Sequence, residues 1–249
     1  MNLRTLTSSS VSPEFVLEVI RDEHRQACEF DPEAEPDSVL GFETTIAEWQ
    51  YACDLVDWKP LRIALNSSWN IDASDSDWQR VLTPENERTL RDLCGFIADQ
   101  AAVESAAVPV IQGKACPPAG MFFAVREILE NGGADVRKLR PSSSLEPFCR
   151  KHLDLFLGPV SRLAPGRLPV IKISQPLYDV ALALLVLSWL TAIILSLLGN
   201  WLIGLGIYFV AYLALRLISR FSTPRSIGFG SLQTFRDLSE TLSSGKGNP

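Results

Sequence analysis

The sequence has few of the residues that build catalytic and metal sites. It contains only two histidines, His24 and His152, and they are far apart. Its five cysteines are widely spaced and form no CxxC pair, so the ligand spacing of a zinc site is missing. We expect the cysteines to be reduced and mostly buried. They are Cys28, Cys53, Cys94, Cys116 and Cys149.

Other signatures of chemistry are missing as well. Nucleophilic catalysis needs a serine or cysteine oriented by a histidine, and both histidines stand among charged residues, which favours surface positions. The acidic run Asp72, Asp75 and Asp77 lacks the glycine and closing glutamate of an EF-hand and indicates a helix N-terminus. Gly228 and Gly230 do not form a phosphate-binding motif. We therefore predict no catalytic, cofactor-binding or metal-binding residue, and a non-enzymatic role is favoured.

The first half of the chain has few basic residues. Residues 1–110 carry 21 acids and 8 bases, a formal −13, whereas residues 111–249 carry 8 acids and 15 bases, a formal +7. The acids can form an ordinary solvated face, or they can mark a surface for a partner. The acidic balance and the lack of a basic cluster with interleaved aromatics exclude nucleic acid as a partner.

Charge is nearly absent from residues 180 to 218. Val180–Leu198 is a 19-residue apolar run, followed by the turn residues Gly199 and Asn200 and a second run, Trp201–Leu215. A helix of that length spans a hydrocarbon core of roughly 30 Å. These runs predict a transmembrane helical hairpin over 177–220, with the lipid bilayer as a partner. Bases flank the hairpin on both sides, which predicts a multi-pass inner-membrane location with both termini cytoplasmic.

The remaining periodicity is helical, and no strand alternation is evident. We therefore expect an all-α fold, with small helical bundles plus the two-helix transmembrane hairpin. Trp49, Trp58, Trp69 and Trp78 are expected to anchor a core or an interface. The predicted divisions are a disordered tail over 1–12 with no signal peptide, an acidic helical domain over 13–103, a linker over 104–118, a second helical unit over 119–176 and 222–243, and a disordered tail over 244–249.

One short motif occurs twice. Thr89–Leu93 reads TLRDL and Thr234–Leu238 reads TFRDL, and each is expected to open a short helix. Around the first copy, Ala64–Gln100 resembles the second half of an acyl carrier protein, and Val125–Leu145 resembles the first helix and following loop of that family. The resemblance implies small four-helix bundles. It also implies that a second carrier-like unit begins near Met121 and is completed by Thr234–Leu242.

The sequence departs from the carrier pattern at the functional position. Carrier proteins attach phosphopantetheine to a serine in an Asp-Ser-Leu motif, and the aligned pair here is Asp54–Leu55. In the second unit only Ser142–Ser144 precede Leu145, and no such motif occurs. The resemblance therefore implies the fold and no functional residue.

Three functions remain open. The leading hypothesis is a membrane-anchored, non-enzymatic interaction or scaffold protein whose acidic domain docks a cytoplasmic protein partner. The second is a carrier-like component of acyl or lipid metabolism that uses another attachment residue. The third is a membrane-bound enzyme acting on a lipid-linked substrate.

Overall fold

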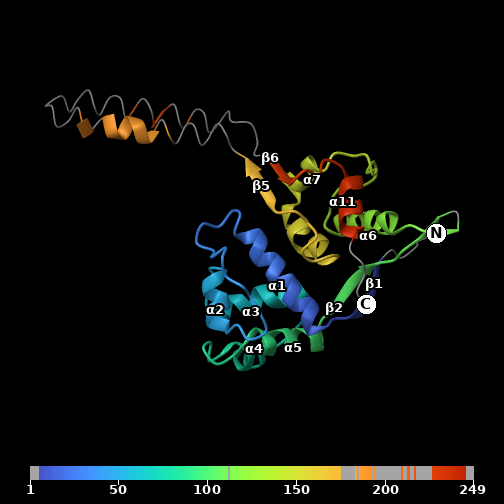
Figure 1. Ribbon diagram of the computed structural model, residues 1–249, viewed down its shortest axis with the longest axis horizontal. Coiled ribbons are helices and arrows are strands. Elements are labelled where there is room, and N and C mark those ends of the chain that lie inside the picture. The colour runs from blue at the N-terminus through green and yellow to red at the C-terminus, as the bar shows by residue number, and fades with distance from the viewer. Residues whose placement is uncertain are drawn as a thin grey trace. The chain divides into compact units, whose positions relative to one another are not determined.

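The computed structural model describes residues 6–111, 113–174 and 226–244, together with 183, 185–191, 193–194, 209, 212–213 and 216 (Figure 1). The chain divides into two compact units, residues 1–172 with 228–249, and residues 173–227. The first unit contains two sets of helices, which we call the first and second modules.

Five helices form the first module: α1 (Pro13–Ala27), α2 (Ile46–Ala52), α3 (Trp58–Trp69), α4 (Asp75–Leu82) and α5 (Leu90–Gln100). Each begins where the sequence supplies a side-chain cap. Ser12 accepts from the Phe15 N–H at α1, and Ser74 accepts from the Asp77 N–H at α4. Thr45 forms a reciprocal capping box with Glu48 at α2.

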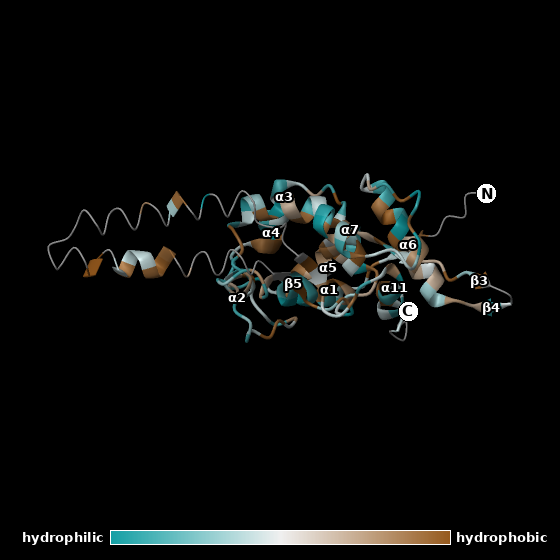
Figure 2. Ribbon diagram, turned by 90° about the horizontal axis from the view of Figure 1, so that it is seen from above, coloured by the Kyte–Doolittle hydropathy of each residue, from teal (hydrophilic) through white to brown (hydrophobic). Residues whose placement is uncertain are grey.

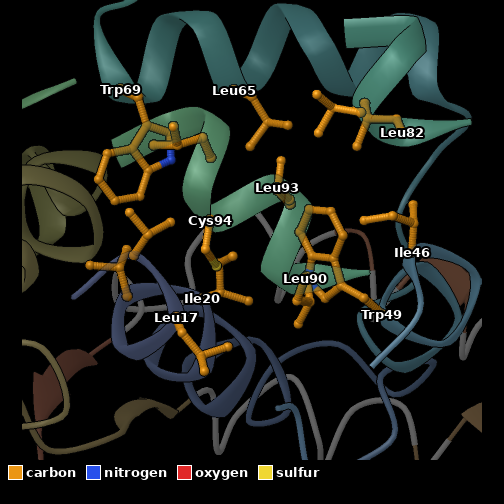
Figure 3. Close-up of a cluster of buried hydrophobic side chains, with 14 of the residues drawn as sticks. Leu17, Ile20, Ile46, Trp49, Leu65, Trp69, Leu82, Leu90, Leu93 and Cys94 are labelled. Atoms are coloured by element: carbon orange, nitrogen blue, oxygen red, sulfur yellow. The ribbon is translucent and has the colours of Figure 1, made fainter. Parts of the chain in front are cut away.

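The core of the first module lies where these helices meet (Figure 3). Each helix carries both hydrophilic and hydrophobic residues, so that one side of it can be buried (Figure 2). α1 packs on α5, and α3 and α5 both contact α4. Trp78 is fully buried, its indole N–H donates to Asn66 Oδ1 at 2.9 Å, and its ring meets Phe96 edge-on. Trp49 and Trp69 are also buried, which confirms the core prediction for these tryptophans.

A short antiparallel ladder joins the two ends of the first module. β1 (Leu6–Ser10) pairs with β2 (Ala102–Ala106), with Leu6 opposite Ala106 and Ser10 opposite Ala102. Because α1 packs on α5, the residues before α1 and after α5 are brought together, and their backbone groups pair. Leu6–Ser10 falls in the segment predicted as a disordered tail. The predicted linker likewise contains the hairpin of β3 (Val110–Ile111) and β4 (Lys114–Ala115).

The second module is built from α6 (Pro117–Asn131), α7 (Glu146–Lys151), α8 (Leu153–Leu155), the π-helix η1 (Phe156–Val160) and α11 (Phe235–Ser243). β5 (Ile171–Ser174) pairs with β6 (Ser226–Phe229). α11 packs on α6, as α5 packs on α1 in the first module. The Phe148 and Phe235 rings lie perpendicular, with centroids 5.2 Å apart, and link α7 to α11.

The same hydrogen-bond pattern occurs in both modules. In the first, the Leu90 N–H donates to Thr44 and the Ile46 N–H donates to Arg88, so that the start of α2 lies beside the start of α5. In the second, the Phe235 N–H donates to Ser143 and the Leu145 N–H donates to Gln233. Each pair of bonds forms an isolated antiparallel bridge. The bridge joins Thr45 to Thr89 in the first module and Ser144 to Thr234 in the second. The recurring TLRDL and TFRDL motifs therefore open the last helix of each module, each with a capping box.

Gly120 in α6 is required by a close backbone approach. A Cβ there would lie 2.5 Å from the Ala107 carbonyl oxygen, whereas a Cβ at Gly95 in α5 would meet nothing within 4 Å. We expect Gly120→Ala to lower the free energy of unfolding by about 1–3 kcal/mol, because the backbone must shift. Gly95→Ala should raise it by up to about 1 kcal/mol through helix propensity. Urea unfolding of both variants measures these changes. An equal change in the free energy of unfolding for the two variants would contradict the close packing at Gly120.

The predicted all-α class is wrong, because three two-stranded sheets accompany the helices: β1 with β2, β3 with β4, and β5 with β6. The β1–β2 ladder joins segments nearly a hundred residues apart, and its serine-rich strand shows no alternation of polar and apolar residues. Local periodicity therefore gave no signal for it.

The predicted transmembrane hairpin is contradicted as well. In the part of the chain that the structure describes, no helix has both the length and the apolarity needed to cross a membrane. Most of the range 177–220 lies outside the described residues. The predicted multi-pass inner-membrane location rested on that hairpin and is contradicted by the same finding.

Candidate functional site

His24 and Cys28 are adjacent, but they do not form a catalytic pair. The His24 Nε2 atom lies 3.0 Å from the Glu35 carbonyl oxygen and 3.4 Å from Cys28 Sγ. A carbonyl oxygen can only accept a hydrogen bond, so Nε2 must carry the proton and cannot remove one from the thiol. Burial also raises the pKa of Cys28. His24 is therefore a structural residue that ties α1 to the following loop.

Cys53, Cys94 and Cys149 are also unsuited to nucleophilic chemistry. Burial raises the pKa values of Cys53, Cys94 and Cys149 to about 12. Because the thiolate is the reactive form, these thiols are inert at neutral pH. All five cysteines are free, but only Cys94 and Cys149 are buried and the other three are half-buried, so the prediction that they are mostly buried is wrong.

The acidic run before α4 has a structural role. Asp77 accepts from Ser74, which lowers the pKa of its carboxyl group, and it also pairs with Arg80 at 3.1 Å. Asp75 pairs with Arg62 of α3 at 2.9 Å. Within residues 6–111, 113–174 and 226–244, no three potential metal ligands come together. Gly228 lies in β6, and Gly230 follows it with φ at 55° in a turn.

The attachment position that the carrier resemblance implies, Asp54–Leu55, lies in the loop between α2 and α3 and has no hydroxyl group. α3 has Asp57 as its N-cap and begins with Trp58, Lys59, Pro60 and Leu61, none of which bears a hydroxyl group. Ser142–Ser144 lie before α7, where the Ser143 carbonyl accepts from Phe235. His152 ends α7 and is half-buried.

A buried polar cluster holds the two modules together. Asp22 of α1 is 3% exposed, pairs with Arg25 at 2.5 Å and accepts a hydrogen bond from the Ser161 hydroxyl. Gln26 donates to the carbonyls of Leu168 and Pro169, and its Oε1 accepts from the Ile171 N–H at 3.0 Å. α1 thus binds residues 161–171 through polar side chains on its buried side.

The sequence contained a signal for this cluster that the prediction missed. Val19, Asp22 and Gln26 are spaced three and four apart, so the two polar residues continue the apolar stripe of α1. A polar side chain on such a stripe must find hydrogen-bond partners when it is buried. The partners came from residues about 140 positions later, which local reasoning did not supply.

A groove of about 710 Å³ is lined by α3, β2 and the α8–η1 region. The Arg162 guanidinium lies over the Trp69 ring at 4.4 Å, pairs with Glu23 at 2.9 Å and donates to the Ser68 carbonyl. The chain's own Arg162 therefore covers the Trp69 ring, and the Ser68 hydroxyl donates to the Leu65 carbonyl.

The largest concentration of one charge lies on residues 28–57, which we call the acidic face. This segment comprises the α1–α2 loop, α2 and the loop between α2 and α3, and it contains nine acids and no lysine or arginine. Among the described residues only Glu43 of this set forms an ion pair, with Arg91. All but Asp31 are exposed. The nine are Glu29, Asp31, Glu33, Glu35, Asp37, Glu43, Glu48, Asp54 and Asp57.

The acidic face also exposes large apolar side chains. Val39 is 91% exposed, Tyr51 72%, Val56 57% and Phe30 51%. The loop is fixed beside α2, since the Glu35 N–H donates to the Ala52 carbonyl at 2.9 Å. The loop is also fixed to α1, because Arg21 Nε donates to the Leu40 carbonyl at 2.7 Å. The loop of the acidic face is therefore fixed by hydrogen bonds, and the face exposes both charged and apolar side chains to a partner.

Comparison with protein-family models, curated proteins and solved structures found no match for this chain.

Proposed function

We propose that this protein is a non-enzymatic interaction protein that docks a basic protein partner on its acidic face. The observation that carries the proposal is the coincidence of uniform charge and exposed apolar side chains on residues 28–57. Eight acids are exposed there, and Val39 and Tyr51 are mostly exposed. Exposed apolar groups rimmed by charge are typical of protein-binding surfaces.

Charge determines the chemistry of the partner. A surface of one sign attracts the opposite sign and raises the association rate, and it repels acidic competitors. The exposed tyrosine, valines and phenylalanine gain from contact with apolar atoms, which a partner can supply with apolar side chains or with the methylene stems of its lysines and arginines. The acidic face therefore fits a basic surface, and a basic amphipathic helix is a suitable probe for it. The acyl carrier resemblance remains a prediction about fold.

Binding of a defined peptide tests this function. A fluorescent helical peptide of lysine and leucine, basic on one side and apolar on the other, is titrated with the full chain. Neutralising Glu29→Gln, Glu33→Gln and Asp37→Asn together should weaken binding about tenfold, because three attractive charges are removed. Binding by the wild-type chain should also weaken as salt is added.

A matched variant separates the acidic face from net charge. Asp72→Asn, Glu87→Gln and Asp99→Asn remove the same charge from exposed positions outside residues 28–57. This control should bind the peptide as the wild type does. Equal weakening in both variants, or no binding by the wild type, would contradict the proposed function.

A further inference from the structure

The second module has a basic surface at the position where the first module has its acidic face. We call it the basic face and define it by five exposed residues of the α6–α7 loop and α7: Arg137, Lys138, Arg140, Arg150 and Lys151. Residues 132–152 contain only two acids, Asp135 and Glu146. Arg137 pairs with Asp135 at 2.7 Å, which leaves four bases of this set free of any ion pair among the described residues.

The equivalence of the two positions follows from backbone hydrogen bonds. The α1–α2 loop ends at Thr45, which bridges to Thr89, and the α6–α7 loop ends at Ser144, which bridges to Thr234. The loop that leads into α2 therefore corresponds to the loop that leads into α7. One structural position carries a net charge of opposite sign in the two modules.

The two faces are not paired with each other within the chain. No ion pair in the described part of the molecule joins a residue of 28–57 to one of 132–152. The five bases are exposed, and so are all of the nine acids except Asp31. The acidic face is therefore open to a basic surface, and this chain carries one that is also open.

We infer that the acidic face of one copy docks on the basic face of a second copy. This inference rests on the proposed function and names the partner as the chain itself. The contact uses two different surfaces, so it is heterologous: the first copy keeps its basic face free for a further copy, and the second keeps its acidic face. Such head-to-tail contacts produce a ring if the rotation between copies closes, and a filament if it does not.

Exchange of charge between two copies tests the inference. Two full-length copies with different tags are co-expressed, one is captured, and the amount of the other is measured. The acid-reversed variant carries lysine at six exposed positions, Glu29→Lys, Glu33→Lys, Glu35→Lys, Asp37→Lys, Glu43→Lys and Asp54→Lys, which change the net charge of residues 28–57 from −9 to +3. The base-reversed variant carries Lys138→Glu, Arg140→Glu and Lys151→Glu. When both tagged copies carry the same reversed variant, the amount of the second copy recovered with the first should fall at least about tenfold. The reason is that like charges then face each other.

The mixed pair provides the rescue. An acid-reversed copy with a base-reversed copy should associate again, because the acidic surface of one matches the basic surface of the other; misfolded variants could not do this. A control that reverses six exposed acids outside residues 28–57 should associate as the wild type does; it carries Glu14→Lys, Glu18→Lys, Asp72→Lys, Glu87→Lys, Asp99→Lys and Glu130→Lys.

Three results would overturn the inference: wild-type copies that do not associate, reversed variants that associate as well as the wild type, or a mixed pair that stays apart. Peptide binding without association of copies would overturn only the identity of the partner. Failure of peptide binding as well would overturn the proposed function.

Discussion

Replacing Asp22 by asparagine is expected to lower the free energy of unfolding by roughly 2–3 kcal/mol. The carboxylate is 3% exposed and accepts from both Arg25 and Ser161. An asparagine keeps the shape but turns an NH₂ group toward one of these donors and removes the charge. Breaking a buried pair costs about 3–5 kcal/mol. We expect a loss below that range because the Arg25 side chain is 37% exposed, so that solvent screens its attraction to Asp22.

Urea unfolding measures this loss, and Glu18→Gln on the exposed side of α1 is the control. Glu18 forms no ion pair among the described residues, so its replacement should change the free energy of unfolding by less than about 0.5 kcal/mol. Because Asp22 joins α1 to residues 161–171, the Asp22 variant should also exchange the Ile171 amide proton faster. An unchanged unfolding midpoint would contradict the buried polar cluster.

Phe235→Ala is expected to cost about 3–5 kcal/mol, because a fully buried ring is removed from the second module. Phe235 contacts Phe148 of α7, and its ring centroid is 6.4 Å from that of Phe156 in η1. The α11 helix that it opens packs on α6. Loss of the ring should therefore loosen α6 and α7 together, although about a hundred residues separate them from Phe235.

The equivalent residue of the first module provides a matched variant. Leu90 is also fully buried and opens α5. Hydrogen exchange of Leu90→Ala should show faster exchange in α1 and α2, whereas Phe235→Ala should show it in α6 and α7. Faster exchange spread evenly over both modules in each variant would mean that α11 does not complete a separate second module.

Local signals in the sequence predicted where α4 and α5 of the first module begin. Ser74 and Thr89 stand directly before helices, because a side-chain cap acts within three residues of itself. The TFRDL motif likewise gave the start of α11, at Thr234. Within the predicted second helical unit, residues 146–160 are divided into α7, α8 and η1, and Pro159 lies inside the last of these.

Features that depend on distant partners were missed. The β1–β2 ladder and the contacts of Asp22 and Gln26 join segments that are widely separated in the sequence. The acidic face was visible as a charge imbalance, but composition could not separate a solvated surface from a docking surface. The distinction came from Val39 and Tyr51, whose exposure only the structure gives. The predicted transmembrane hairpin rested on apolar length alone and is contradicted in the described residues.

The docking of the acidic face on the basic face can be measured most directly by zero-length cross-linking. Equal amounts of ¹⁵N-labelled and unlabelled full chain are mixed and treated with a carbodiimide, which joins a lysine amine to a carboxylate in contact with it. The account predicts links between copies of different isotope, from Lys138 or Lys151 to carboxylates of residues 28–57. Links from these lysines only within one copy, or only to carboxylates outside residues 28–57, would contradict it.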